Sequence, residues 1–447
     1  RARNYIRLPA QDGSMTDWIG DTFTSSVGWD HLETLVDVDT RMAGSDGERR
    51  AAEATRDALA EVGARNAHLE TFPIQGWKRG RSAIDAGDTT QDCIALPRSP
   101  SGDVTGELVD LGYGLPSDFD RDLEGTVVMA ASDVPEWYDR YVHRREKYYH
   151  AVEAGAAAFV YANHVEGCLP PTGSVGTDEA PIGDIPAAGV SKEVGARLSR
   201  RFDGGTVSVS VDAEAPDATS GNVHADLGPE TEEAVLLTSH VDAHDIAEGA
   251  ADNGAGTATV VEVARALAQR EDELDTRVHI VVFGAEEVGL VGSHHDAERR
   301  DHDAITAVVN NDGVARARDL VCDTHGFDDL ADVADRVADR MDHPIDTTPE
   351  LGPHSDHWPY VMWGVPGYYV RSDTGTVGRG WGHTYADTLD KLDSRDLREQ
   401  AILLTELVVE LAAADTTIEH RSPESIADQL ETEGLAEGMR VIGDWPY

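Results

Sequence analysis

Three apolar segments of the chain are each followed closely by histidine or acidic residues. The segments, which have the composition of buried strands, are AVLLTS (234–239), VHIVVF (278–283) and AITAVV (304–309). The residues that follow them are, in chain order, His240 with Asp242, Glu286 with Glu287, and Asp312. Ligands of open α/β sheets bind beyond the carboxyl ends of the strands. We therefore expect these side chains to converge on one site.

Two further segments supply residues of the same kind. The loop GAADNGAG carries Asp252 just before an expected helix, whose N-terminus favours an anion, and GWGHTYADT carries His383. Imidazole and carboxylate groups are the ligands that zinc prefers when no cysteine is at hand. Two zinc ions about 3.5–4 Å apart share one carboxylate and take further ligands on each side. Five ligands suffice for such a pair, and the sequence supplies five with one acid to spare.

Glu286 and Glu287 are adjacent, so their side chains cannot both point at the same ion. The economical interpretation is that one glutamate is a metal ligand and its neighbour a general base. Each motif alone is common in so acidic a chain, and a pair such as Glu232–Glu233 has no claim to function. The hypothesis of a metal site rests on the placement of several such motifs together at the ends of strands. The loop GAADNGAG is not read as a dinucleotide-binding loop, because Thr259 stands at the third glycine position of that motif.

Apolar strands alternate with helical patterns over much of the chain, which predicts an α/β fold with a mixed, largely parallel central sheet flanked by helices. Beyond the three segments above, a strand is expected around 67–72 and another over 366–370. Helices are expected over 47–63, 255–269, 288–300, 327–341, 394–414 and 423–435. Residues 97–215 are rich in Gly, Pro and short alternating runs and predict a β-rich insert. The expected domains are 15–96 together with 216–447, and the insert 97–215.

The charge balance limits the partners of the protein. The chain has 84 acidic and 37 basic residues among 447, a formal net charge of −47. This excess argues against binding to nucleic acid or to an anionic membrane. It also indicates a protein from a halophile, because at ~1 M salt the Debye length falls to roughly 3 Å and the self-repulsion of the folded state is screened.

The cysteines and the ends of the chain give little information about function. No run approaches the ~18 apolar residues that a membrane helix needs, and the three cysteines are too far apart for a zinc finger or a disulfide framework. We expect residues 1–14 to be sequence added for expression and Met15 to be the native start. With no signal peptide visible, a cytoplasmic location is expected, although secretion with a cleaved leader stays open.

The candidate motifs together resemble a known family. The segments HVDAHDIAEGAADNGAGTA, VVFGAEEVGLVGS, VNNDG and GHTYADT resemble, in order, the five metal motifs of the bacterial leucyl aminopeptidase family of zinc peptidases. Plasma glutamate carboxypeptidase and the transferrin receptor belong to the same clan. The segment RMAGSDGERRAAEATRDALAEVGA resembles the N-terminal helix of the family, and EAGAAAFVYAN and IPAAGVS resemble a protease-associated domain. The resemblance covers roughly residues 30–415.

The resemblance implies a ligand for each position of a two-zinc centre. His240 and Asp312 correspond to the terminal ligands of one zinc ion, Glu287 and His383 to those of the other, and Asp252 to the carboxylate that bridges the two ions. The implied cofactor is therefore two Zn²⁺. The implied substrate is a peptide, and the sequence does not indicate an oligomeric state.

The resemblance also implies roles for residues beside the ligands. Glu286 corresponds to the general base, and Asp242 to the acid that orients His240. The stretch HSDHWPY resembles a family segment near the substrate, so Asp356 and His357 are candidates for lining the pocket, with a structural turn as the alternative.

An aminopeptidase is the function that these residues favour. No basic cluster stands out that would receive a substrate carboxylate, although Arg371 and Arg379 keep carboxypeptidase or dipeptidase action open. A glutaminyl-cyclase-type acyltransferase would use one zinc ion rather than two. A non-catalytic binding homologue would have lost ligands, and this chain keeps every one of them.

Overall fold

The structure is a computed structural model that describes residues 16–375 and 380–447. The expected native start at Met15 and the candidate Arg379 lie outside the described residues. Among the helices of the described ranges, none combines the length and the apolar character that a bilayer crossing would require.

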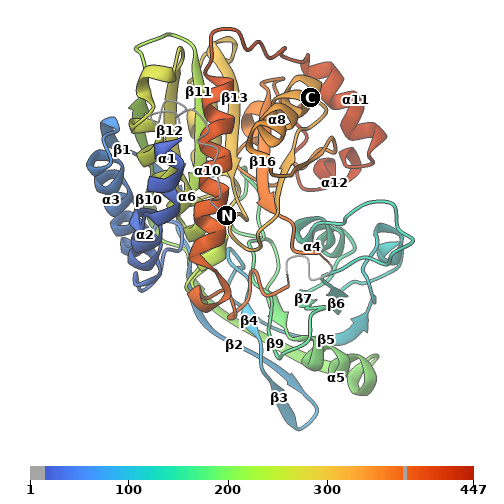
Figure 1. Cartoon of the computed structure of the whole chain (residues 1–447). Helices are drawn as coiled ribbons and strands as arrows, with labels where there is room; N and C mark the ends of the chain where they lie inside the picture. The colour runs from blue at the N-terminus through green and yellow to red at the C-terminus, as the bar shows by residue number, and fades with distance from the viewer. Residues whose placement is uncertain (1–15, 376–379) are drawn as a thin grey trace, which may run out of the picture.

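The larger of two sheets has eight strands in the order β1-β10-β12-β11-β13-β16-β14-β15 (Figure 1). These strands are β1 (Arg65–Gln75), β10 (Asp217–Leu227), β11 (Ala234–His240), β12 (Arg277–Phe283), β13 (Ile305–Asn311), β14 (Leu320–Asp323), β15 (Ile345–Thr348) and β16 (Gly367–Ser372). The central strands β12, β11, β13 and β16 are parallel to one another, and β14 is parallel to β15. The pairs β1–β10, β10–β12 and β14–β16 are antiparallel. This arrangement confirms the predicted mixed, largely parallel sheet.

Alternate residues of the central strands enter different cores. Val235 and Leu237 of β11 pack into the large core under the helices that include α6 (Ala255–Ala268) and α10 (Ser394–Leu411). Their neighbours Ala234 and Leu236 pack on the opposite face, beside α7 and α9. Because both faces are covered, each of these strands is apolar throughout, which is the pattern that predicted them.

The helices of the described residues include the six expected from the sequence, which lie close to their expected positions, and others that were not expected. They are α1 (Asp17–Thr24), α2 (Val27–Val36), α3 (Asp46–Glu61), α4 (Arg144–Glu153), α5 (Lys192–Phe202), α6 (Ala255–Ala268), α7 (Val291–Ala297), α8 (Asp328–Met341), α9 (Trp358–Val361), α10 (Ser394–Leu411), α11 (Pro423–Thr432) and α12 (Ala436–Val441). In Figure 1, α1, α2, α3, α6 and α10 stand on one side of the large sheet, while α11 and α12 lie at the end nearest the C-terminus.

The second sheet belongs to the insert and has the order β3-β2-β9-β5-β6-β7-β8-β4. Its strands are β2 (Lys78–Ala86), β3 (Thr89–Gln91), β4 (Ile94–Ala95), β5 (Gly102–Asp110), β6 (Val127–Ala131), β7 (Ala158–Ala162), β8 (Ala187–Val190) and β9 (Thr206–Glu214). The expected boundary at residue 97 therefore falls after three strands of this sheet rather than before them. The composition changes only after these strands, and alternation along a strand does not reveal which of two sheets the strand joins.

The chain passes between the sheets at two adjacent places. It leaves the large sheet between β1 and β2, at residues 76–77, and returns between β9 and β10, at residues 215–216. The backbone N–H of Gly76 donates to the carbonyl of Pro216 at 2.9 Å, which ties the two crossings together. The insert is thus connected to the large sheet through the neighbouring strands β1 and β10, and it lies beside the carboxyl ends of the parallel strands (Figure 1).

Candidate metal centre

The candidate residues converge at the carboxyl ends of β11, β12 and β13. His240 is the last residue of β11, and Asp312 follows β13 directly. Glu286 and Glu287 lie in the turn after β12, and Asp252 lies in the loop that leads into α6. All five side chains are at least 87 % buried, with exposed fractions between 1 % and 13 %.

His240, Asp252 and Asp312 form the first of two groups of converging donors. His240 Nε2 lies 3.5 Å from Asp252 Oδ1 and 3.8 Å from Asp312 Oδ1. One donor atom from each residue falls within 4.8 Å of the other two, a spacing that suits a shared ion. The Ser355 hydroxyl donates to Asp312 Oδ2 at 2.6 Å, which leaves Asp312 Oδ1 to face the group.

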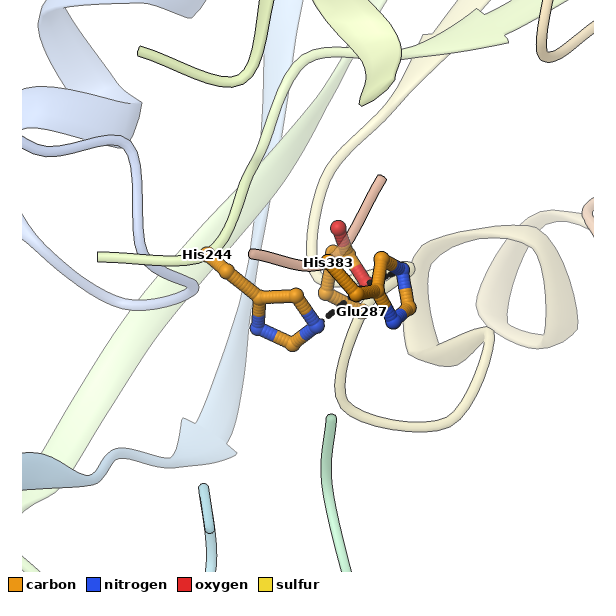
Figure 2. Close-up of side chains that lie close together, drawn as sticks. All are labelled: His244, Glu287 and His383. Carbon is orange, nitrogen blue, oxygen red and sulfur yellow. Dashed lines mark ion pairs between the residues drawn. The ribbon is translucent and has the colours of Figure 1, made fainter. Parts of the chain in front are cut away.

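The second group consists of His244, Glu287 and His383, whose donor atoms also lie within 4.8 Å of one another. Figure 2 shows the two imidazoles approaching the Glu287 carboxylate from different segments of the chain. His383 Nε2 lies 3.3 Å from Glu287 Oε2 and 3.1 Å from Asp252 Oδ2. Asp252 therefore presents one oxygen to each group, Oδ1 to the first and Oδ2 to the second.

Asp242 fixes both His240 and the two glutamates. Its Oδ1 accepts the backbone N–H of Glu286 at 3.0 Å and its Oδ2 that of Glu287 at 3.1 Å. His240 Nδ1 lies 3.1 Å from the carbonyl oxygen of Asp242 and 3.4 Å from its Oδ1. Because both of these atoms are acceptors, Nδ1 carries the proton. When the ring is neutral, as a metal ligand is, its lone pair is then on Nε2, which points at Asp252 and Asp312.

Two residues that the sequence analysis missed hold the loop of Asp252. Asp387 accepts the backbone N–H groups of Ala251 at 2.8 Å and of Asp252 at 3.1 Å. The buried guanidinium of Arg41 donates to the carbonyls of Val241 at 2.9 Å and of Gly249 at 2.8 Å, both in the segment that leads from β11 to Asp252. Asp387 stands four residues after His383 in GHTYADT, but nothing in its spacing distinguishes it from the many other acids.

Burial and like charges act strongly on the acids of the centre. Burial, together with the charges of Glu287, Asp356 and Asp312, raises the pKa of Glu286 well above its ordinary value, against the opposing effect of His240. Burial raises the pKa of Asp387 to about 6, helped by the charge of Asp252. Burial lowers the pKa of His240, but Glu286 and the neighbouring aspartates outweigh it and raise that pKa well above 6.5.

The donor set fits a pair of divalent cations. His240 Nε2 and Glu287 Oε1 are buried and make no hydrogen bond within the described part of the chain. Buried polar atoms without partners are destabilising, and so are several carboxylates in one buried site. Cations between the two groups would satisfy both needs, and imidazole with carboxylate is a donor set that suits zinc.

A cavity of about 820 Å³ opens onto the centre and has walls from three parts of the chain. Glu286, Glu287 and Asp312 form its floor. The insert contributes Tyr141, His143, Arg144 and Arg145, and the C-terminal segment contributes Asp444 and Trp445. Arg145 joins these walls, because its guanidinium binds Asp444 through two contacts of 2.6 and 2.9 Å. The size suits a short peptide rather than a folded protein.

The prediction that Asp356 and His357 line the pocket is corrected by the structure. Both are fully buried, and neither is among the residues of the cavity wall, to which His354 and Trp358 contribute from the same segment. His357 stacks on His325 with ring centroids 4.5 Å apart. The segment therefore has the structural role that the sequence analysis kept as the alternative, since the sequence does not tell which side of a turn faces a cleft.

Arg371 lies in the cavity wall, but its guanidinium is already paired. Arg371 Nε lies 3.0 Å from Asp323 Oδ2, and a second nitrogen lies 3.1 Å from Asp323 Oδ1. This pairing makes Arg371 a poor receptor for a substrate carboxylate.

Comparisons with known proteins agree with this architecture. Residues 222–408 match peptidase family M28, and residues 104–198 match the PA domain. The chain is 26 % identical over 341 residues to aminopeptidase YwaD of Bacillus subtilis strain 168, covering 73 % of this chain and 70 % of that protein. It is 25 % identical over 408 residues to carboxypeptidase Q of Bos taurus, covering 87 % and 85 % of the two chains.

A solved structure extends the match to nearly the whole chain. The aminopeptidase from Aneurinibacillus sp. strain AM-1 superposes with a TM-score of 0.68 at 26 % identity, covering 91 % of this chain and 98 % of that one. The chain is therefore similar to peptidase family M28 over residues 222–408 and to the PA domain over residues 104–198, and it is homologous to bacterial aminopeptidases and to carboxypeptidase Q.

Proposed function

We propose that the protein is a two-zinc exopeptidase, and specifically an aminopeptidase that releases N-terminal residues from peptides. The observation that carries the proposal is the position of Asp252, which presents one carboxylate oxygen to each of two groups of buried donors. Two metals that act together need such a shared carboxylate.

The five predicted residues divide naturally between the two ions. His240 and Asp312 would hold the first ion, Glu287 and His383 the second, and Asp252 both. When bound, the zinc ions supply Lewis-acid polarisation of the scissile carbonyl and lower the pKa of water at the site.

Glu286 is the proposed general base. Its carboxylate is buried, and its Oε2 lies 3.9 Å from His240 Nε2, beside the donors of the first ion. Its side chain lines the cavity, so it can take a proton from the attacking water and return it to the leaving amine. Asp242 is the proposed positioning residue, because its carboxylate fixes the backbone of Glu286 and its backbone carbonyl accepts from His240 Nδ1.

Aminopeptidase action is preferred over carboxypeptidase action for two reasons. Arg371 is paired with Asp323, so it is not available to bind a substrate carboxylate. Two of the relatives described above carry the name aminopeptidase, and both align over most of this chain. Carboxypeptidase or dipeptidase action remains the second candidate, because carboxypeptidase Q aligns over 87 % of the chain.

The proposal is tested with matched sets of short peptides in high salt with added zinc. One set has a free N-terminus and a blocked C-terminus, and the other has the reverse. We expect cleavage of the first set from the N-terminus and none of the second. Release of C-terminal residues from N-blocked peptides would establish the carboxypeptidase direction instead.

A further inference from the structure

We propose that His244 is an additional protein ligand of the second zinc ion, which makes the two metal sites chemically unequal. The inference rests on the proposed two-zinc centre and extends it beyond the five predicted ligands. His244 is four residues after His240, beyond the end of β11, in the sequence His240-Val-Asp-Ala-His244.

The position of the His244 ring carries the proposal. Its Nε2 lies 2.9 Å from Glu287 Oε2, and His383 Nε2 lies 3.3 Å from that same oxygen. The His244 and His383 rings are perpendicular, at 89°, with centroids 4.5 Å apart, so they approach Glu287 from different directions (Figure 2). Three donors that surround one point in this way form an incomplete coordination shell.

The contacts of His244 are not those of a hydrogen-bonded core histidine. The residue is 6 % exposed, and within the described ranges neither of its ring nitrogens makes a hydrogen bond of acceptable geometry. His244 Nε2 and Glu287 Oε2 are therefore close together, but their geometry is not that of a hydrogen bond. Glu287 Oε1 is likewise buried without a hydrogen bond in the described ranges. An ion between the two residues would satisfy both groups, whose burial is otherwise unfavourable.

Another cluster of histidine and acidic residues, outside the proposed centre, provides a contrast. Glu70, His224 and Asp296 also bring three donor atoms within 4.8 Å of one another. There, however, Asp296 is bound by the Arg300 guanidinium and by the Tyr360 hydroxyl, and Glu70 by Arg299. Cations of the protein itself already neutralise those carboxylates. Within the described ranges, no arginine or lysine is paired with Glu287. Its two ion-pair partners there are His244 and His383.

The additional imidazole changes the chemistry of the second site. The first ion would have one imidazole, whereas the second would have two, and both would share Asp252. Imidazole-rich sites favour zinc, cobalt, nickel and copper over the harder manganese and magnesium ions. The second site should therefore hold its ion more tightly and discriminate more strongly against Mn²⁺ and Mg²⁺.

The experiment measures zinc affinity and cobalt absorption of the full chain in high salt. The metal-free protein is titrated with Zn²⁺ against a chromophoric chelator, which yields a dissociation constant for each site, and with Co²⁺ while the visible spectrum is recorded. The variants are His244→Ala and His244→Gln. His31→Gln is the control, because His31 is also a buried histidine but bonds to Thr55 rather than to the centre.

Supporting residues of metal sites change affinity by about 10–100-fold, so removal of a ligand should weaken one of the two constants by about 100-fold or more. Both His244 variants should show this loss and a changed Co²⁺ spectrum for that equivalent, while His31→Gln matches the wild type. If both His244 variants have the zinc dissociation constants and the Co²⁺ spectra of the wild type, His244 is not a ligand, and the proposed two-zinc function is unaffected. A wild-type protein that binds fewer than two zinc ions would instead refute the two-zinc function.

A crystal structure of the zinc-loaded wild type decides the same point without any variant. His244 Nε2 should lie about 2.0–2.1 Å from the second ion, as imidazole ligands of zinc do. An Nε2 atom more than about 3 Å from that ion, with Glu287 and His383 bound at ligand distances, would contradict the proposal.

Discussion

The carboxylate oxygen Oδ1 of Asp242 accepts the backbone N–H of Glu286 at 3.0 Å, across the gap between the ends of β11 and β12. The other oxygen of the same carboxylate accepts the next N–H along the chain. One side chain therefore holds the backbone of the proposed general base and of its neighbouring ligand. The backbone carbonyl of Asp242 also accepts from His240 Nδ1, so all three residues contact Asp242.

Asp242→Asn is predicted to weaken metal binding and catalysis together. The amide would place an N–H₂ group against one of the backbone N–H groups, and it would lose the charge that favours His240 as a ligand. Supporting residues of this kind are worth about 10–100-fold in metal affinity or activity. Zinc titration and kcat/KM measure the loss. Asp226→Asn, which removes the carboxylate bound to His279 outside the centre, should leave zinc affinity unchanged.

Glu286→Gln is predicted to abolish most turnover while keeping both metals. General acid–base catalysis contributes about 10²–10⁴-fold to a rate, so kcat should fall by roughly that factor. KM and the number of zinc ions per chain should change little, because the side chain is not one of the proposed ligands. Glu287→Gln is the matched control and should lose the second ion. Near-normal hydrolysis by Glu286→Gln would refute the base assignment.

Stability is predicted to fall in mild acid, in part through His31. Burial, and to a lesser degree the charge of Arg41, lowers the pKa of His31 from 6.5 to about 4. The unfolded chain takes up the proton below pH 6.5, but the folded chain does so only near pH 4. The contribution of His31 is therefore complete above pH 6.5 and is lost as the pH falls towards 4. By pH 5 about 2 kcal/mol of this contribution has been lost.

Urea unfolding of the wild type and of His31→Gln at pH 7 and pH 5, at constant high salt, measures this contribution. The loss of unfolding free energy between the two pH values should be about 2 kcal/mol smaller in the variant. An equal loss in both proteins would show that His31 is protonated in the folded state.

Folding and activity are predicted to require high salt. With a net charge of −47, the acidic residues repel one another in dilute buffer. At ~1 M salt the Debye length is roughly 3 Å, and most of that repulsion is screened. Far-ultraviolet circular dichroism and peptidase activity, followed during stepwise dialysis from molar salt, should decline together. Full activity after dialysis into low salt would contradict the prediction.

The sequence was sufficient for the parallel strands at the middle of the large sheet and for most of the candidate centre, but it did not predict β10, β14 or β15. The continuous apolar runs predicted β11, β12 and β13 because both faces of these strands are covered. The rule that ligands bind beyond the carboxyl ends of parallel strands then brought His240, Glu287 and Asp312 together. These inferences depend on local patterns, which a single sequence displays.

Contacts between distant segments could not be predicted in the same way. Arg41 reaches the loop of Asp252 from a segment some two hundred residues earlier in the chain, and no local pattern marks it. His244 carried a weak signal, a third member in a His-x-Asp-x-His sequence after a strand, but only the fold shows that its ring turns toward Glu287. The docking of Arg145 on Asp444 likewise depends on how the insert sits, which composition does not encode.

The most direct test of the account is the anomalous scattering of a zinc-loaded crystal at the zinc edge. Asp252 presents its two oxygens to two separate groups of donors, so two peaks should flank its carboxylate, about 3.5–4 Å apart. His240 and Asp312 should adjoin one peak, and Glu287 and His383 the other. A single peak, or peaks that leave Asp252 without a metal contact, would contradict the two-zinc centre.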